Sequence, residues 1–295
     1  MKANKIHKGP LKGIKILDLT KLYPGPLATM LMADMGADVI KIEDINNPDY
    51  MRTFPPFIGS ESSAYLALNR SKRSLLVDLN SDDGKKIFFE LLKTTDIVIE
   101  QFRPGVIDKL GLGYEQAIKY NDNIIYVSIT GYGQDGPYAG KAGHDINYIS
   151  YSGILGSTNT NDNGPTIPGL QIADTAGGAY MGVIACLSAL ISRQSTGKGQ
   201  KVDVSMLDSI LPLMSLQFAQ EWSNIPLSPF KGESEENTKN VLTGKMANYN
   251  IYKCADGKYL ALGALEPKFW YKFCEMVDRP EWKNAVFSPE IDQKQ

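Results

Sequence analysis

The chain has 295 residues, 43% of them hydrophobic and 22% charged, and no stretch approaches the roughly 20 apolar residues that a membrane helix needs. Its 31 basic and 33 acidic residues give a formal charge of −2, which argues against nucleic acid or an anionic membrane as a partner. Three cysteines without CxxC spacing argue against a disulfide framework or a zinc site. Because the N-terminus also lacks the apolar core of a signal peptide, we expect a cytoplasmic protein.

The first 43 residues predict a βαβ unit. Residues 14–20 form a short apolar run, and Pro26 is suited to the first turn of the helix that follows, up to about Met35. Gly36 ends that helix, and residues 37–43 read as a second strand. Two strands joined by a helix predict parallel pairing.

The same pattern continues along the chain. Residues 75–79 predict a strand, and Ser81 is suited to cap a helix that reaches about residue 93. Strands are then expected at 96–101 and 124–129. This alternation predicts a doubly wound α/β domain.

The region after the last of these strands is rich in glycine. Residues 131–143 contain five glycines and one proline, which indicates a loop at the carboxyl end of a parallel strand, where open α/β sheets bind ligands. Long helices are predicted from Asp174 to about residue 192 and over 205–222.

A smaller domain is expected at the end of the chain. Residues 223–245 are polar and predicted to be irregular, and residues 249–253 and 258–263 flank a turn that indicates a β-hairpin. We therefore expect a large domain over 1–222 and, over 223–295, a linker with a smaller α+β domain.

His144 is a candidate general base. The chain has two histidines, and His7 lies in a basic N-terminal segment, which leaves His144 next to the glycine-rich loop. Histidine as a residue type suits proton transfer at neutral pH. A hydrogen-bonded structural histidine is the alternative that the spacing leaves open.

Asp174 is a second candidate, at the start of the long helix. Its ordinary role there would be that of an N-cap, and a helix N-terminus also favours an ionised carboxylate. Gly177 and Gly178 follow in the first turns, where each glycine costs about 1 kcal/mol relative to alanine. Close approach of a ligand and close packing of a neighbouring helix explain them equally well.

Two basic segments are candidates for binding phosphate. Residues 69–73 (NRSKR) precede a predicted strand, and Arg103 follows another, at positions where Arg and Lys pair with phosphate. A solvated basic surface is the alternative in both places.

These motifs together resemble CoA-transferase family III, which includes acyl-CoA transferases and α-methylacyl-CoA racemases. The similarity covers nearly the whole chain. It is carried by the blocks at residues 16–26, 33–41, 69–78, 102–105, 130–137 and 197–203.

Within that family, residues 143–148 (GHDINY) resemble the racemase signature, and the family's catalytic aspartate matches Asp174. The resemblance implies that His144 and Asp174 exchange one proton at the carbon beside a thioester, through an enolate. Asp145 and Glu266 would orient or tune this pair. Backbone N–H groups near the glycine-rich loop or the helix start are candidates to stabilise the enolate oxygen.

The resemblance also implies where an acyl-CoA substrate binds. No separate cofactor and no metal are expected, because CoA is part of the substrate. The family's arginine shortly after the second strand falls on Asp44, which removes one phosphate contact. The residues implied for CoA are Leu76, Val77, Asp78, Leu79, Arg103, Lys109, Gly143, Asn147 and Tyr148.

The family fold is a Rossmann-like large domain with a small domain, assembled as an interlocked homodimer. Family members are usually longer, so a C-terminally truncated chain is expected. Two other functions remain open: a CoA-transferase in which Asp174 is the nucleophile, and a truncated, non-catalytic CoA-binding protein.

Overall fold

The computed structural model describes residues 9–158, 164–223, 242, 244 and 246–287. It divides into two compact units, Met1–Leu213 and Met214–Gln295. The division falls before the boundary predicted at residue 222, because the helix α10 (Ser215–Ser223) is grouped with the second unit. His7 and most of the polar stretch predicted at 223–245 lie outside the described residues.

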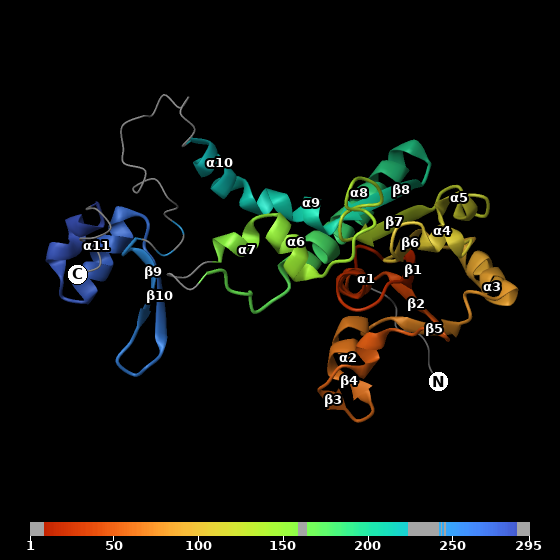
Figure 1. Ribbon diagram of the computed structural model, residues 1–295, viewed down its shortest axis with the longest axis horizontal. Coiled ribbons are helices and arrows are strands. Elements are labelled where there is room, and N and C mark those ends of the chain that lie inside the picture. Colours follow the sequence, from red (N-terminus) through yellow and green to blue (C-terminus); the bar gives the residue numbers. More distant parts are fainter. Residues whose placement is uncertain (1–8, 159–163, 224–241, 243, 245, 288–295) are drawn as a thin grey trace. The chain divides into compact units, whose positions relative to one another are not determined.

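Unit 1 is built on a six-stranded parallel sheet in the order β5-β2-β1-β6-β7-β8, whose labels can be followed in Figure 1. The chain moves outward in one direction from β1 and then in the other from β6, so the order reverses between these two strands. This is the doubly wound α/β fold predicted from the sequence. The strands are β1 (Lys15–Leu19), β2 (Asp38–Asp44), β5 (Arg73–Val77), β6 (Ile97–Glu100), β7 (Ile125–Thr130) and β8 (Gln200–Ser205).

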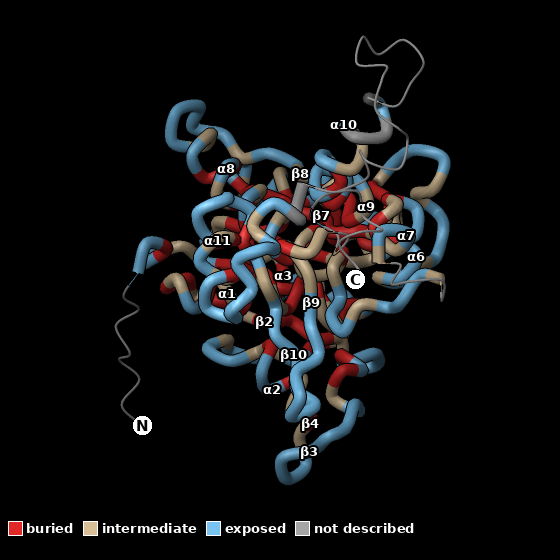
Figure 2. Tube along the Cα trace, turned by 90° about the vertical axis from the view of Figure 1, so that its left-hand side faces the viewer, coloured by how far each residue is buried: buried red, intermediate tan, exposed pale blue. Residues whose placement is uncertain are grey.

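Helices cover both faces of this sheet. On one face, α1 (Pro24–Asp34) and α8 (Met181–Thr196) pack on the strands and on each other. On the other face, α3 (Asp82–Leu92), α4 (Val106–Lys109) and α5 (Tyr114–Ala117) contribute side chains to one apolar core with β1, β6 and β7. The buried strands form the red interior of the tube in Figure 2.

The predicted boundaries differ from the structure in a few places. The prediction of Ser81 as a cap is confirmed, because its hydroxyl oxygen accepts the N–H of Gly84 at 3.0 Å. Helix α1 begins at Pro24 rather than at Pro26, and β5 begins at Arg73 rather than at Leu75. Strand β8 (QKVDVS) was not predicted, although Val202 and Val204 alternate with polar residues.

An excursion follows β2 before the chain returns to the sheet. It contains the 3₁₀ turn η1 (Tyr50–Thr53), the two-residue strands β3 (Phe57–Ile58) and β4 (Glu61–Ser62), and the helix α2 (Ser63–Asn69). Its outer end is exposed, as the pale colour around β3 and β4 in Figure 2 shows. Its base is held by ion pairs from Lys41 to Asp49 at 3.1 Å and from Arg52 to Glu43 at 2.7 Å.

The long helix predicted from Asp174 consists of two consecutive helices of different type. A π-helix, η2 (Ala173–Tyr180), runs directly into α8. By length and composition alone, the segment Ala173–Thr196 is long and apolar enough to cross a membrane, so the expectation that no stretch approaches this length is wrong. Here, however, it packs against α1, β7 and β8, as core helices of α/β domains do. The predicted helix at 205–222 is likewise interrupted: α9 (Met206–Ile210), the 3₁₀ turn η3 (Leu211–Met214) and α10 follow one another.

Unit 2 contains the predicted hairpin. Strands β9 (Tyr249–Lys253) and β10 (Tyr259–Gly263) pair antiparallel, and α11 (Pro267–Met276) and the 3₁₀ segment η4 (Pro280–Phe287) follow. Its small core contains Ala264, Trp270 and Cys274, and the indole of Trp270 donates to the carbonyl oxygen of Trp282 at 3.0 Å.

Candidate active site

A cavity of about 970 Å³ opens in unit 1 at the carboxyl edge of the sheet. Its wall is formed by the loops that follow β1, β6 and β7, together with η1 and the segments around residues 144 and 174. Those loops flank the point between β1 and β6 at which the strand order reverses. Open α/β sheets bind their ligands in this crevice.

His144 and Asp174 both line this cavity. His144 is the residue before α6 (Asp145–Tyr151), where its backbone N–H donates to Oδ1 of Asn147 at 3.0 Å and its side chain is exposed. Asp174 is the second residue of η2, whose N-cap is Ile172, so the interpretation of Asp174 as an N-cap is wrong. The structure thus brings the two predicted bases to one cavity.

The carboxyl group of Asp174 is chemically distinct from an ordinary aspartate. Burial raises its pKa from 3.8 to about 7, and the neighbouring charge of Asp145 acts in the same direction. Oδ1 of Asp145 also accepts the backbone N–H of Asp174 at 3.0 Å. Burial thus opposes the ionised form that a helix N-terminus favours. Near neutral pH this carboxyl group is divided between its acid and its base form.

The two glycines after Asp174 are explained by packing. A Cβ on Gly177 would collide with the backbone carbonyl oxygen of Met206. A Cβ on Gly178 would lie 2.6 Å from Cβ of Pro24, well inside van der Waals contact. Of the two alternatives that the sequence left open, close approach of neighbouring elements is the one that the structure supports. This packing presses η2 against the loop after β1.

The glycine-rich loop encloses Tyr148. The hydroxyl of Tyr148 donates to the carbonyl oxygen of Gly143 at 2.7 Å. A Cβ on Gly131 would lie 2.5 Å from the ring of Tyr148, and a Cβ on Gly143 would lie 2.7 Å from it. Burial and the carboxylate of Asp174 together raise the pKa of Tyr148, which keeps this phenol protonated. The loop therefore has glycine where the tyrosine ring needs room.

The residues predicted to bind CoA are divided between the cavity and other places. Arg103, Gly143, Asn147 and Tyr148 line the cavity. The described lining does not include residues 76–79, at the end of the edge strand β5, or Lys109, at the exposed end of α4. Their contact with CoA stays a prediction. Glu266 lies in unit 2, at the N-cap of α11, and its predicted role near the catalytic pair also stays a prediction.

The basic cluster at residues 69–73 is engaged in ion pairs. Arg70 pairs with Asp34 at 2.5 Å, Lys72 with Asp18 at 3.0 Å, and Arg73 with Asp38 at 2.7 Å. The side chain of Lys72 is buried. Lys72 thus has a structural role in a buried ion pair, whereas phosphate binding by the exposed Arg70 and Arg73 stays a prediction.

Lys141 is a cavity residue that sequence reasoning missed. It lines the same cavity as Arg103, and its amino group lies 3.9 Å from the centre of the Tyr138 ring. A basic residue inside the glycine-rich loop was the available signal. It adds a second positive charge to the wall.

The backbone donors at the helix start are already engaged. The N–H of Asp174 is bonded to Asp145, and the N–H of Thr175 donates to the carbonyl oxygen of Gln171 at 3.2 Å. The expectation that these N–H groups would stabilise an enolate oxygen is therefore wrong for these two residues.

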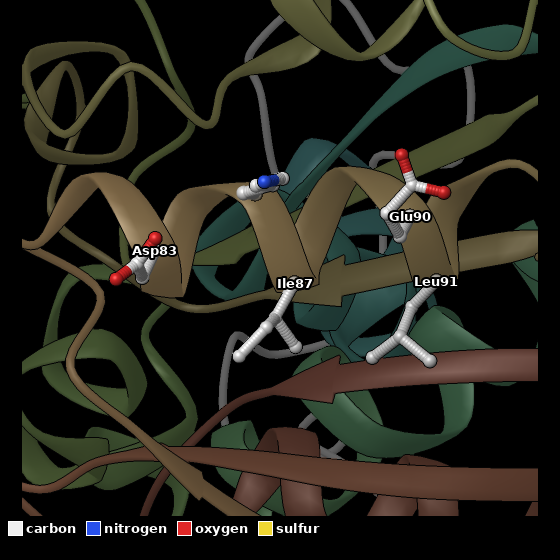
Figure 3. A pocket seen from close by; sticks show the side chains of 5 residues that line it. Asp83, Ile87, Glu90 and Leu91 are labelled. Carbon is white, nitrogen blue, oxygen red and sulfur yellow. The ribbon is translucent and has the colours of Figure 1, made fainter.

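A separate hollow of about 530 Å³ lies along α3. Figure 3 shows Asp83, Ile87, Glu90 and Leu91 along one face of this helix. All its lining residues come from one helix, so it lacks the convergence of different elements that marks a binding site. In the part of the chain that the structure describes, no group of three or more His, Cys, Asp or Glu side chains is arranged to hold a metal ion.

Known proteins that are similar to this chain fall into two functional groups. The chain is 37% identical over 92% of its length to a human succinyl-CoA:glutarate CoA-transferase, of which it spans 60%. It is 34% identical over 96% of its length to a mouse α-methylacyl-CoA racemase, of which it spans 70%.

The fold is shared with solved structures of the same kind. A CAIB/BAIF family protein from Brucella suis superposes with a TM-score of 0.80 at 31% identity, covering 97% of this chain and 75% of that one. The family model for CoA-transferase family III matches residues 11–294. The chain therefore belongs to CoA-transferase family III.

Proposed function

We propose that this protein is a 2-methylacyl-CoA racemase that inverts the carbon beside the thioester by 1,1-proton transfer. The observation that carries the proposal is that one cavity is lined both by His144 and by Asp174, whose carboxyl group has a pKa of about 7. A racemase needs one group that accepts a proton and one that returns it. A carboxyl group that titrates near neutral pH can do either. CoA is part of the substrate, and no separate cofactor is proposed.

In this mechanism the acyl-CoA lies with its α-carbon between His144 and Asp174. One of them removes the α-proton, and the electron pair moves into the thioester to give an enolate. The other then delivers a proton to the opposite face, so that the configuration inverts. The two residues exchange roles with the handedness of the substrate, and Asp145 holds the backbone at Asp174 in place.

The phosphates of CoA are assigned to two basic side chains that line the cavity. Arg103 and Lys141 line the cavity and suit the phosphates of CoA. Tyr148, Gly143 and Asn147 would shape the wall beside the thioester. By family resemblance we also propose an interlocked homodimer in the cytoplasm and a role for Glu266 in orienting or tuning the catalytic pair.

A second function, CoA transfer to a carboxylic acid, is favoured by the human relative's name. Asp174 would then attack the thioester carbonyl and form a mixed anhydride. That role gives His144 no task in the reaction. For this reason we prefer proton transfer.

The deciding experiment uses one enantiomer of a 2-methylacyl-CoA in deuterated water. Deuterium at the α-carbon together with loss of optical purity is the expected result. Hydroxylamine is added in a parallel sample, because it converts an acyl-aspartate anhydride into a hydroxamate that intact-protein mass spectrometry detects. A hydroxamate at Asp174 with an inert α-carbon would establish transfer instead. Tight CoA binding with neither reaction would indicate a non-catalytic CoA-binding protein.

Arg103→Ala is expected to weaken the binding of free CoA by about 1–3 kcal/mol, the usual contribution of a charge-assisted hydrogen bond. Isothermal titration calorimetry of the parent and the variant measures this difference. Lys119→Ala, at an exposed basic residue to which no CoA contact is assigned, is the matched comparison. Equal affinity for parent and Arg103→Ala would show that Arg103 belongs to the solvated surface.

Asp145→Asn is expected to shift the pH dependence of racemisation. The asparagine keeps an oxygen that can accept the N–H of Asp174 but removes the charge that helps to raise the pKa of Asp174. The pKa of Asp174 should fall, so the pH below which its base form is lost moves to lower pH. A pH profile of kcat/KM for the direction in which Asp174 is the base measures this shift. An unchanged acidic limb would assign that limb to another group.

A further inference from the structure

Tyr23 has an unused hydrogen-bond donor on the cavity wall. Its side chain lines the cavity, and the hydroxyl of Thr175 donates to the phenolic oxygen of Tyr23 at 3.2 Å. With Thr175 as the donor in that bond, the single proton of the Tyr23 hydroxyl is available to a ligand in the cavity. Among the described residues, none accepts it.

The backbone around Tyr23 is held firmly. Leu22 has a left-handed conformation with φ 64, and its N–H donates to Oδ1 of Asp49 at 3.0 Å. The buried amino group of Lys41 pairs with the other oxygen of Asp49 at 3.1 Å. The carbonyl oxygen of Tyr23 accepts the N–H of Leu27 at 3.0 Å, which starts α1. A non-glycine residue at positive φ is strained, and here the surrounding contacts maintain it.

The same loop lies against the catalytic helix. Thr175 follows Asp174 directly in η2, and Pro24 is the residue that a Cβ on Gly178 would meet. Tyr23 is therefore tied to η2 by its side chain, while the residue after it packs on the same helix. This places the phenol of Tyr23 on the wall of the cavity that Asp174 also lines.

We propose that the hydroxyl of Tyr23 donates a hydrogen bond to the thioester oxygen of the substrate and stabilises the negative charge that develops there. This assignment rests on the proposed function. It supplies the donor that the N–H groups of Asp174 and Thr175 cannot supply, because both are already bonded. A donor aimed at developing oxyanion charge in a shielded site is among the largest contributors to catalysis.

The chemical balance of the step is simple. The base takes the α-proton, the C–H electron pair becomes part of a C=C bond, and the C=O electron pair moves onto oxygen. Reprotonation of the α-carbon reverses both shifts. Tyr23 keeps its proton throughout, and no oxidant, reductant or third reactant is needed.

The test is Tyr23→Phe, which removes one oxygen atom and keeps the ring. The rate of α-proton exchange into deuterated water at saturating substrate should fall roughly 100-fold, the usual loss for one oxyanion donor, with little change in KM. Tyr180→Phe is the matched control, since Tyr180 is an exposed tyrosine of the same π-helix outside this cavity, and it should retain full activity.

A binding measurement separates this proposal from the function on which it rests. Acetoacetyl-CoA forms an enolate that absorbs in the ultraviolet, and its absorbance on the protein reports stabilisation of the oxygen whether or not any reaction follows. The parent should shift the ligand toward the enolate, and Tyr23→Phe should not. Thr175→Val, which keeps the phenol but loses the group that orients it, should give an intermediate shift.

Each outcome bears on one of the two proposals. Equal enolate absorbance in parent and Tyr23→Phe, or none in the parent, would overturn the role of Tyr23. A hydroxamate at Asp174 with no exchange at the α-carbon would overturn the racemase. Because the enolate measurement needs no turnover, it still decides the role of Tyr23 in that case.

Discussion

His144→Ala is expected to abolish racemisation while leaving the affinity for free CoA unchanged. The variant loses one of the two groups that face the α-carbon, and positioned acid-base groups contribute roughly 10²–10⁴-fold to rate. The contacts proposed for CoA phosphates, at Arg103 and Lys141, remain in place. Loss of optical purity of one 2-methylacyl-CoA enantiomer, followed over time, measures the first effect, and calorimetry with CoA measures the second.

His7→Ala is the matched control, because it removes the chain's other histidine. Unchanged racemisation by His144→Ala would contradict the two-base mechanism. If the variant instead exchanges the α-proton of one enantiomer without inversion, Asp174 alone is removing and returning the proton on one face. That result would refine the mechanism and leave Asp174 as a base.

Asp174→Asn is expected to abolish turnover and, at the same time, to stabilise the folded protein at pH 8. The pKa of Asp174 is about 7 in the folded protein, whereas its ordinary value, expected in the unfolded chain, is 3.8. Ionisation of this carboxyl group therefore favours the unfolded state. The free energy of unfolding of the parent should fall as pH rises from about 4 to 7 and stay level above that. Asparagine does not ionise, so the variant does not lose stability in this way as the pH rises.

The stability gain is on the order of 2 kcal/mol at pH 8, after allowance for partial exposure of the carboxyl group, and should shrink toward zero near pH 4. Urea unfolding of the parent and the variant at both pH values measures it. Asp122→Asn, at an exposed aspartate, shows how much of any difference comes from the amide itself. A gain at pH 8 equal to that at pH 4 would mean that Asp174 is not the buried, titrating group described here.

Much of the large unit was predictable because its signals are local. The alternation of apolar strands with capped helices identified β1, α1, β2, β6 and β7, and Ser81 was correctly identified as a cap. Strand β8 escaped prediction; it pairs with β7 along its whole length, and such pairing is a tertiary contact. The π-helix escaped it as well, since the contacts of Gly177 and Gly178 with Met206 and Pro24 are tertiary.

Some residues of the candidate site were likewise predictable from the sequence, and others were not. His144, Asp174 and Arg103 could be named from their residue types and from motifs at the ends of predicted strands, and all three line one cavity. Tyr23 could not be named, because its importance comes from the orientation of one hydroxyl proton, and that depends on Thr175, which is 152 positions away in the chain. The pKa of Asp174 also depends on burial of its carboxyl group, which a local sequence pattern cannot predict.

The π-helix has a mechanical consequence for how this protein can vary. Its hydrogen bonds span one residue more than those of an α-helix, so successive side chains are rotated by a smaller angle about the axis. The side chain of Asp174 therefore points in a different direction about the helix axis than it would if the α-helical geometry of α8 extended back to residue 174. Removing one residue between Asp174 and Met181 would restore an unbroken α-helix, keep the inner face of α8 on the sheet, and turn the carboxyl group away from its present bearing.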